Sequence, residues 1–321
     1  MSQVARPAKA SHPEAVEGST TFSSPGMSSD QVYFRTDDAW DFIPDGHGLS
    51  MPVVDVREEA KLLRFITSAK CIDAFAARHK SEFRPFTLFG SGDFRHLSAV
   101  WTRQFNEPFT LLSFDNHPGW DLRPPKWSCG GWINRALENP LGKSVAVWGC
   151  NNFACSFPAR FLGNRRAAKT HRLLLYPWRL RRVRYPAYFN PLRIGNWKTM
   201  FMDWLDHNHD HPVYVTIDMD CLVASEAVTN WEHGRFTCDN IVWALGKLRE
   251  KVKIIGGDLC GGWSQPDYGT TLQKLAGWYG HPPAHAPMRQ DLLSSNLVTL
   301  DRLWPVLTGT PVEQPPSYPQ I

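Results

Sequence analysis

The sequence predicts an α/β protein built on a mainly parallel β-sheet that is covered by helices. Strand-like apolar runs alternate along the chain with amphipathic runs that have the spacing of helices, and no internal repeat is visible. The chain has 321 residues, of which 42% are hydrophobic and 21% are charged, so it can bury a large core. A disordered chain, a fibrous repeat and a small disulfide-stapled domain are therefore excluded.

Six runs have the composition of β-strands. In chain order they are residues 51–56, 85–90, 109–115, 144–150, 213–220 and 252–259. The helices predicted between them are residues 58–79, 95–105, 197–207 and 240–250, with Asp239 as the cap of the last. Open parallel sheets bind their ligands beyond the carboxyl ends of the strands, so the functional residues should lie there.

The two ends of the chain differ in composition from its middle. Residues 1–30 are rich in Ser, Pro, Ala and Gly, which predicts a disordered N-terminal arm. Residues 281–321 are rich in proline and predict a C-terminal tail, in which residues 292–307 could form a docked helix. Residues 31–280 would then form a single α/β domain.

Composition also indicates a compartment. No run approaches the roughly 18 apolar residues that a bilayer span needs, and the N-terminal arm has no apolar stretch typical of a secretory signal. The seven cysteines form no C-x-x-C pair, which argues against a disulfide framework and a zinc ribbon. We therefore expect a cytoplasmic protein that does not bind membranes.

Positive charge gathers in one segment. The formal net charge is +4, but residues 139–202 contain twelve Lys or Arg and no Asp or Glu, so they carry +12 and the remainder carries −8. The densest part, residues 159–186, is interpreted as a basic insertion. Such a segment could bind phosphates or nucleic acid, but we favour pairing with acids elsewhere in the fold or across a subunit interface.

Three strand ends finish in clusters of acids and histidines. The clusters are residues 90–96 (GSGDFRH), 113–121 (SFDNHPGWD) and 216–222 (TIDMDCL). Side chains two residues apart in an extended segment point the same way. Asp115 should therefore pair with His117, and Asp218 with Asp220.

These two pairs have the donor atoms of a metal site. Buried carboxylates without a partner are costly, and one divalent cation compensates several of them. Oxygen and imidazole ligands without a thiolate favour Mn²⁺ over Zn²⁺. A single acid at a strand end often only caps a helix or accepts backbone N–H groups, but two such pairs together favour a metal.

In their order and separation the three clusters, together with residues 229–234 (TNWEHG), resemble the motifs of the ureohydrolase superfamily of arginase and agmatinase. The resemblance is stronger to an uncharacterised arginase-like subgroup, and it spans about residues 85–262. It implies a three-layer α/β/α sandwich around a binuclear Mn²⁺ centre that activates a bridging hydroxide.

The resemblance also implies which residues are the metal ligands. Asp115 and Asp218 would bridge the two ions, and His117 and Asp220 would hold one of them. All four positions match the family pattern directly.

At the other ion the chain departs from the family pattern. Phe94 stands at the position of the family's histidine, and Gly119 stands at that of an aspartate. His96 and Asp121, each two residues further along, are the expected replacements. Gly119 permits backbone angles that would let the loop adjust.

The substrate side of the family pattern is altered too. Arginase-type enzymes hold a guanidinium with a D-x-x-E arrangement near the last strand; here Asp258 matches the first acid, but Gly261 stands in place of the Glu. A lost charge-assisted hydrogen bond costs about 1.5–3 kcal/mol, which disfavours arginine and agmatine as substrates. Glu232 could supply an acid from another loop, and His96, His233 and Asp258 are candidates for proton transfer or for support of the ligands.

Three functions remain open. We favour a hydrolase that uses metal-activated water to cleave a C–N bond in a small amide, amidine or guanidino compound. The second is a mononuclear zinc enzyme, since Asp115, His117 and Asp220 are also similar to the zinc site of deacetylases that share the arginase fold. The third is a non-catalytic protein that binds a polyanion through residues 159–186. The expected partner is a small-molecule substrate, and the resemblance is compatible with a homo-oligomer.

Overall fold

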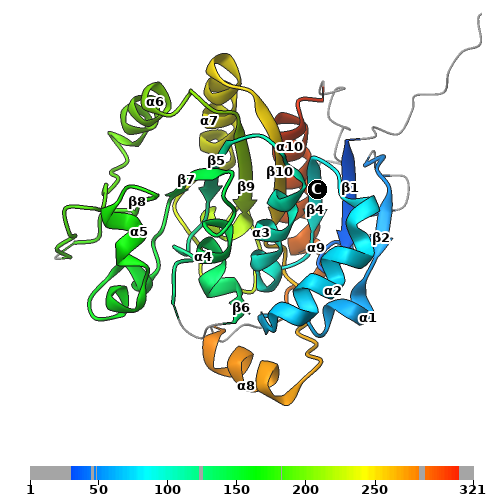
Figure 1. The fold of residues 1–321 in the computed structure, drawn as a ribbon. Coiled ribbons are helices and arrows are strands. Elements are labelled where there is room, and N and C mark those ends of the chain that lie inside the picture. Colours follow the sequence, from blue (N-terminus) through cyan, green and yellow to red (C-terminus); the bar gives the residue numbers. More distant parts are fainter. Residues whose placement is uncertain are drawn as a thin grey trace, which may run out of the picture.

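A computed structural model describes residues 30–44, 47, 49–122, 126–181, 183–281 and 286–310, and one large β-sheet runs through its centre (Figure 1). The eight strands of this sheet are β1 (Gln31–Arg35), β2 (Val53–Asp55), β4 (Phe86–Phe89), β5 (Phe109–Phe114), β7 (Gly142–Trp148), β8 (Leu173–Tyr176), β9 (Val213–Asp218) and β10 (Ile254–Cys260). All neighbouring strands are parallel, in the order β2-β1-β4-β10-β9-β5-β7-β8. The predicted parallel sheet is confirmed, with β1 and β8 as strands that the sequence did not reveal.

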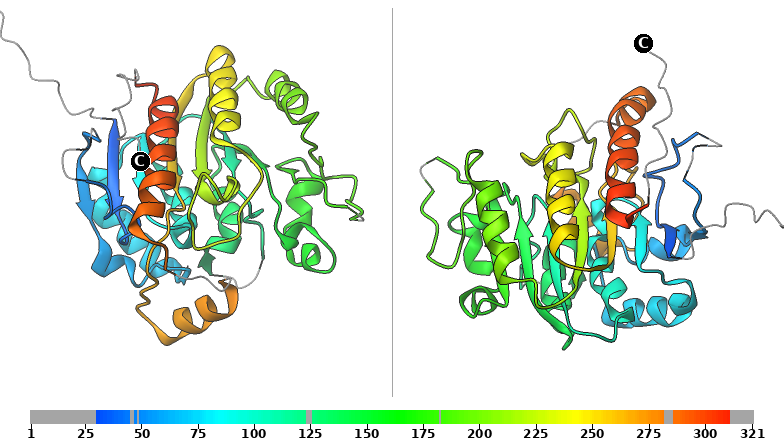
Figure 2. Two further views of the ribbon diagram at one scale, coloured as in Figure 1. Left: turned by 180° about the vertical axis from the view of Figure 1, so that it is seen from behind. Right: turned by 90° about the horizontal axis from the view of Figure 1, so that it is seen from above.

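Helices cover both faces of the sheet, so the molecule has three layers (Figures 1 and 2). They are α1 (Arg57–Ala60), α2 (Ala69–His79), α3 (Ser98–Trp101), α4 (Trp132–Ala136), α5 (Arg165–Lys169), α6 (Trp197–His207), α7 (Cys238–Lys251), α8 (Thr271–Gly280), α9 (Arg289–Leu292) and α10 (Val298–Thr308). Helices α2, α3 and α4 lie on one face, and α7 and α10 lie on the other. A small antiparallel ribbon of β3 (Ile66–Thr67) and β6 (Trp127–Ser128) stands apart from the main sheet.

Alternate residues of a strand enter the two apolar layers. In β5, Phe109 and Leu111 pack into the cluster that contains α2 and α3, whereas Leu112 and Phe114 pack into the cluster that contains α7 and α10. The side chains of a strand point alternately to opposite faces, so a sheet buried on both sides needs apolar residues at nearly every position. This requirement explains why the central strands were recognisable as continuous apolar runs.

The helix predicted over residues 58–79 is interrupted in the structure. α1 ends at Ala60, and α2 begins behind Ser68, whose Oγ accepts a hydrogen bond from the Cys71 N–H at 3.2 Å. Between the two helices Phe65 adopts a φ of 65°, and the next two residues form β3. A positive φ is costly for a bulky side chain, so tertiary contacts override the helical pattern at this point.

Two other helices begin elsewhere than the sequence predicts. The helix expected from residue 95 starts as a 3₁₀ turn, Gly92–Leu97, and becomes α-helical only at Ser98. α7 begins at Cys238 because Thr237, and not Asp239, caps it in a capping box with Asn240.

The folded domain continues beyond residue 280. α10 buries Leu303 and Leu307, and Nε1 of its Trp304 donates a hydrogen bond to Gln31 Oε1 of β1 at 2.9 Å. Residues 289–308 lie in the segment interpreted as a tail but pack on the α/β domain, and α10 corresponds to the docked helix suggested for residues 292–307. The predicted N-terminal arm lies outside the described residues apart from Asp30, and so do residues 311–321.

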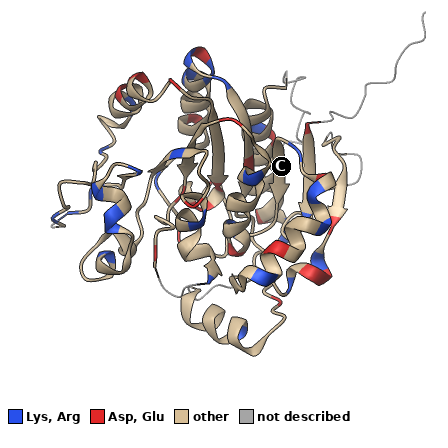
Figure 3. Ribbon diagram, viewed as in Figure 1, with Lys and Arg blue, Asp and Glu red and all other residues tan. Residues whose placement is uncertain are grey.

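The basic segment lies at one edge of the sheet, around α5 (Figure 3). It supplies the edge strand β8, which pairs with β7, so it is an integral part of the fold and not only an insertion. Arg165, Arg166 and Lys169 of α5 are exposed, whereas Arg182 lies outside the described residues. Among the described helices none is long and apolar enough to cross a membrane.

Replacing Leu303 tests whether α10 belongs to the core. Its side chain is fully buried, so Leu303→Ala should lower the free energy of unfolding by about 2–5 kcal/mol in a denaturant titration. Leu275 of α8 is 59% exposed and provides the matched control, because Leu275→Ala should change this free energy by less than about 0.5 kcal/mol. A small effect in both variants would contradict the packing described for α10.

Candidate metal centre

The acids singled out in the sequence lie at the carboxyl ends of the central strands. β5 and β9 are neighbours with Phe114 opposite Ile217, so Asp115 and Asp218 leave the sheet side by side. β10 borders β9 on its other side, with Cys260 opposite Asp218. Parallel strands end at the same edge of a sheet, and this edge is where such folds bind their ligands.

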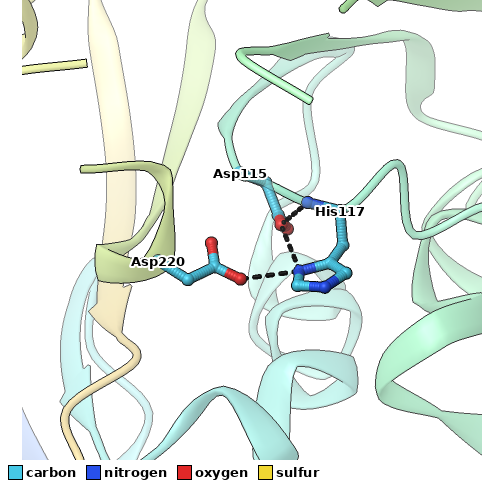
Figure 4. A group of neighbouring side chains, drawn as sticks. All are labelled: Asp115, His117 and Asp220. Atoms are coloured by element: carbon cyan, nitrogen blue, oxygen red, sulfur yellow. Dashed lines mark hydrogen bonds and ion pairs between the residues drawn. The ribbon is translucent and has the colours of Figure 1, made fainter. Parts of the chain in front are cut away.

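Asp115, His117 and Asp220 converge on a common centre (Figure 4). One potential ligand atom from each lies within 4.8 Å of the others. His117 Nδ1 is 2.7 Å from Asp220 Oδ2 and 3.9 Å from Asp115 Oδ1. The structure thus brings together three of the six residues proposed as metal ligands.

Backbone N–H groups hold the carboxylates in place. Asp115 Oδ1 accepts a hydrogen bond from the His117 N–H at 2.7 Å, and Asp220 Oδ1 accepts one from the Asn116 N–H at 3.0 Å. Asp218 Oδ1 accepts one from the Asp220 N–H at 3.1 Å, at the start of the turn Met219–Cys221. Asp115 and Asp218 are therefore fixed by local hydrogen bonds within their own motifs, whereas Asp220 is held by the backbone of the neighbouring motif.

A cavity of about 70 Å³ lies between these residues. It is lined by Gly92, Arg95, Asp115, His117, Cys129, Gly130, Asp218, Asp220 and Trp231. A single water needs a cavity of only about 10–15 Å³, so this one has room for an ion and a few further atoms. Asp218 lines the cavity although it is not one of the three converging residues.

The electrostatics of the cluster indicate a shortage of positive charge. Burial and the neighbouring charge of Asp220 raise the pKa of Asp115 to about 6. Burial, with Asp220 and Asp115, raises the pKa of Asp218 well above its usual value. Burial lowers the pKa of His117, but the carboxylate of Asp220 outweighs that effect and raises it well above the ordinary value. A divalent cation would relieve these conflicts, so the residues present fit a metal ion.

Arg95 supplies a positive charge that the sequence did not lead us to expect. Its buried guanidinium donates from Nε to Asp115 Oδ2 at 3.0 Å, and the same nitrogen lies 3.6 Å from Asp218 Oδ2. On its other side Nη1 lies 3.4 Å from Asp258 Oδ1. Burial alone would lower the pKa of Arg95, but the acids around it outweigh burial and raise the pKa. Arg95 therefore carries its charge inside the site.

Hydroxyl groups and a ring complete the surroundings of Arg95. Nη1 donates to Ser98 Oγ at 2.8 Å and also to Thr216, and Nη2 donates to Ser113 Oγ at 2.9 Å. The guanidinium carbon lies 4.5 Å from the centre of the Trp132 ring. Partners from four separate segments hold the side chain in one orientation.

A buried ion pair anchors the turn that carries Arg95. Asp93 Oδ2 accepts a hydrogen bond from Arg64 Nε at 2.7 Å, and Asp93 Oδ1 lies 2.6 Å from His281 Nε2. Burial raises the pKa of Asp93, but the charge of Arg64 outweighs it and lowers the pKa to about 2. Asp93, the acid of the first cluster, thus links the 3₁₀ turn to Arg64 in the segment between α1 and α2 and to His281, the residue after α8.

His96 and Asp121, proposed for a second ion, do not line the cavity. His96 is fully buried beside Arg95 in the 3₁₀ turn, and burial lowers its pKa to about 4. Asp121 forms a backbone bridge with Gly163 and lines a different hollow with Asn134. The 3₁₀ turn breaks the two-residue periodicity of extended chain, so Arg95 and not His96 faces the carboxylates.

The three residues proposed for catalysis have different positions. Asp258 is fully buried in β10, where it accepts hydrogen bonds from Tyr214 Oη at 2.7 Å and Ser98 Oγ at 3.1 Å. Glu232 Oε2 lies 3.1 Å from His117 Nε2, and this hydrogen bond lowers the pKa of Glu232. His233 does not line the cavity, and burial lowers its pKa. Among the contacts described, Glu232 is the one of these three residues that bonds to a member of the converging group, His117.

Gly261 is required by the geometry of the site. It adopts a φ of 100°, and a Cβ atom there would lie 2.1 Å from Asp218 Oδ1. A positive φ favours glycine, and the contact leaves no room for any side chain. The acid that the family pattern expects at this position therefore cannot be accommodated.

The parallel sheet, its two helical layers and the acids at the carboxyl ends of the central strands define an arginase-like α/β/α fold. The arginase of Bacillus subtilis superposes with a TM-score of 0.50 at 10% identity, over 85% of this chain and 97% of that structure. Proclavaminate amidino hydrolase of Streptomyces clavuligerus gives a TM-score of 0.49 at 14% identity, over 85% of this chain and 92% of that structure. The fold implied by the sequence resemblance is confirmed by the arginase structure.

At the level of sequence, an uncharacterised protein of Thermotoga maritima is 29% identical over 183 residues, which are 56% of this chain and 58% of that relative. The chain thus matches less than two thirds of the length of this curated relative. It matches no model of a known protein family.

Replacing Gly261 tests whether the missing acid is a steric necessity. Gly261→Ala should lower the free energy of unfolding by about 1–3 kcal/mol, because its Cβ displaces Asp218 and forces an unfavourable φ. Gly195 has no atom within 4 Å of an added Cβ, so Gly195→Ala should stay within about 0.5 kcal/mol of the unchanged chain. Equal stability of the two variants in a denaturant titration would contradict the contact.

Proposed function

We propose that this protein is a metal-dependent hydrolase that cleaves a C–N bond in a small amide, amidine or guanidino compound. The observation that carries the proposal is the convergence of Asp115, His117 and Asp220 around a cavity at the carboxyl ends of the central strands. The fold shared with an arginase supports the class of reaction. Oxygen and imidazole donors favour Mn²⁺ over Zn²⁺ as the resident ion.

The residues of this centre would have different roles. Asp115, His117 and Asp220 would hold the ion, which when bound would act as a Lewis acid and lower the pKa of a water to roughly 7. Glu232 bonds to His117 Nε2 and so orients the ring with Nδ1 toward the carboxylates. The Glu232 side chain is 47% exposed, and Glu232 is our candidate for moving a proton between the site and solvent.

The surroundings of the cavity favour a small and uncharged substrate. Gly261 leaves no room for the acid that would bind a guanidinium, and Asp258 is already paired with Arg95 inside the protein. A cationic substrate would thereby lose a charge-assisted bond that is worth about 1.5–3 kcal/mol. Trp231 lines the cavity and stacks on Phe65, with 5.8 Å between ring centres, so one wall is rigid and apolar.

Metal content provides the first test. The double variant Asp115→Ala, Asp220→Ala should lose bound Mn²⁺ to background levels in elemental analysis, because it removes two of the three converging ligands. Its circular dichroism should remain that of a folded α/β protein. Asp203→Ala removes a carboxylate from α6, where the side chain is 77% exposed, and should leave the metal content unchanged. Retention of stoichiometric Mn²⁺ by the double variant would contradict the proposal.

Substrate preference provides the second test. The Mn²⁺-loaded protein should release amine or ammonia from small neutral amides with a higher kcat/KM than it shows for arginine or agmatine. We expect kcat/KM for the neutral amides to be at least tenfold higher, which corresponds to about 1.4 kcal/mol of binding free energy lost by the cationic substrate. A higher kcat/KM for arginine would show that another acid, such as Glu232, binds the guanidinium.

A further inference from the structure

The two oxygens of Asp115 face different partners. Oδ1 lies toward His117 and the centre formed with Asp220, whereas Oδ2 accepts the hydrogen bond from Arg95 Nε at 3.0 Å. Asp218 Oδ2 lies 3.6 Å from the same nitrogen. The guanidinium is thus placed between the two acids that would bridge a pair of ions, on the side of Asp115 opposite to His117.

Side chains fill the space around this guanidinium and leave no room there for a further metal ligand at position 119. Trp132 lies against the guanidinium of Arg95, and a Cβ on Gly119 would lie 2.5 Å from Trp132 Nε1. Gly119 also has a φ of 55°, which disfavours any other residue. The indole therefore fills the volume that an aspartate at position 119 would need. The loss of that ligand and the presence of Arg95 are parts of one arrangement.

Arg95 also occupies the oxygen atoms nearby that could otherwise bind a second ion. Ser98 and Ser113 accept from its Nη atoms, and Asp258 pairs with it at 3.4 Å. Ser98, Ser113 and Asp258 come from α3, β5 and β10, so the guanidinium links three separate elements as a metal ion would. Unlike an ion, it cannot dissociate, and an arginine in a protein keeps its proton.

We propose that this centre binds one divalent cation, and that the guanidinium of Arg95 permanently provides the second positive charge between Asp115 and Asp218. The inference rests on the proposed function, since it assumes that a cation binds at Asp115, His117 and Asp220. It replaces the expected pair of Mn²⁺ ions by one ion and one fixed side chain. Arg95 is then a positioning residue that holds the shared carboxylates in place whether or not the ion is bound.

Metal stoichiometry tests the inference on the unchanged full-length chain. After loading with Mn²⁺ and removal of free ion, elemental analysis should give one Mn²⁺ per chain, and electron paramagnetic resonance should show the spectrum of an isolated ion. Two ions per chain with an exchange-coupled spectrum would overturn the inference and leave the proposed function standing. No bound ion would contradict both.

Variants of Arg95 test the role of the fixed charge. Arg95→Met should lower the Tm of the metal-free protein, and added Mn²⁺ should raise that Tm by more than it does in the unchanged chain. Arg95→Lys keeps a positive charge, so it should recover most of the lost Tm and still bind one Mn²⁺. Arg103 pairs with Asp73 at the surface, and Arg103→Met is the control that should change neither quantity. A Lys variant as unstable as the Met variant would show that shape and not charge is what Arg95 contributes, and would overturn the inference.

Discussion

The structure depends on the neutralisation of carboxylates that adjacent parallel strands bring to one edge of the sheet. β5 and β9 end together, and their acids are buried where water cannot screen them. Burying an unpaired charge is costly, and a nearby positive charge recovers part of that cost. The guanidinium of Arg95 covers one side of Asp115 and Asp218, and the cavity beside His117 leaves room for a cation on the other.

Two buried arginines give this edge of the sheet its rigidity. Arg64 holds Asp93, and Asp93 holds the turn from which Arg95 extends to the strand ends. Each arginine also bonds to serine hydroxyls, Arg64 to Ser264 at 2.6 Å and Arg95 to Ser98 at 2.8 Å. Charge-assisted bonds of this kind are directional, so they set geometry as well as energy. The proposed ligands are thereby positioned by the fold itself.

The sequence could predict the sheet and the converging acids because both depend on local patterns. Continuous apolar runs follow from burial on both faces, and Asp115, His117 and Asp220 follow a strand end by a few residues. Arg95 could not be recognised in the same way, since its partners Ser113 and Asp258 lie far along the chain. The replacements expected at His96 and Asp121 relied on adjustable loops, whereas the turns at Gly92–Leu97 and at Gly119 leave both residues outside the lining of the cavity. The strands β1 and β8 were missed although they are no shorter than β4, and β8 lies within the basic segment that was interpreted as an insertion.

Gly261 limits what a single substitution can change at this edge of the sheet. A Cβ at this position would lie 2.1 Å from Asp218 Oδ1, so an acid introduced here would at the same time displace a carboxylate that lines the cavity. An acid at position 261 could be accommodated only together with changes in the ends of β9 and β10 that make room beside Asp218 and Met219.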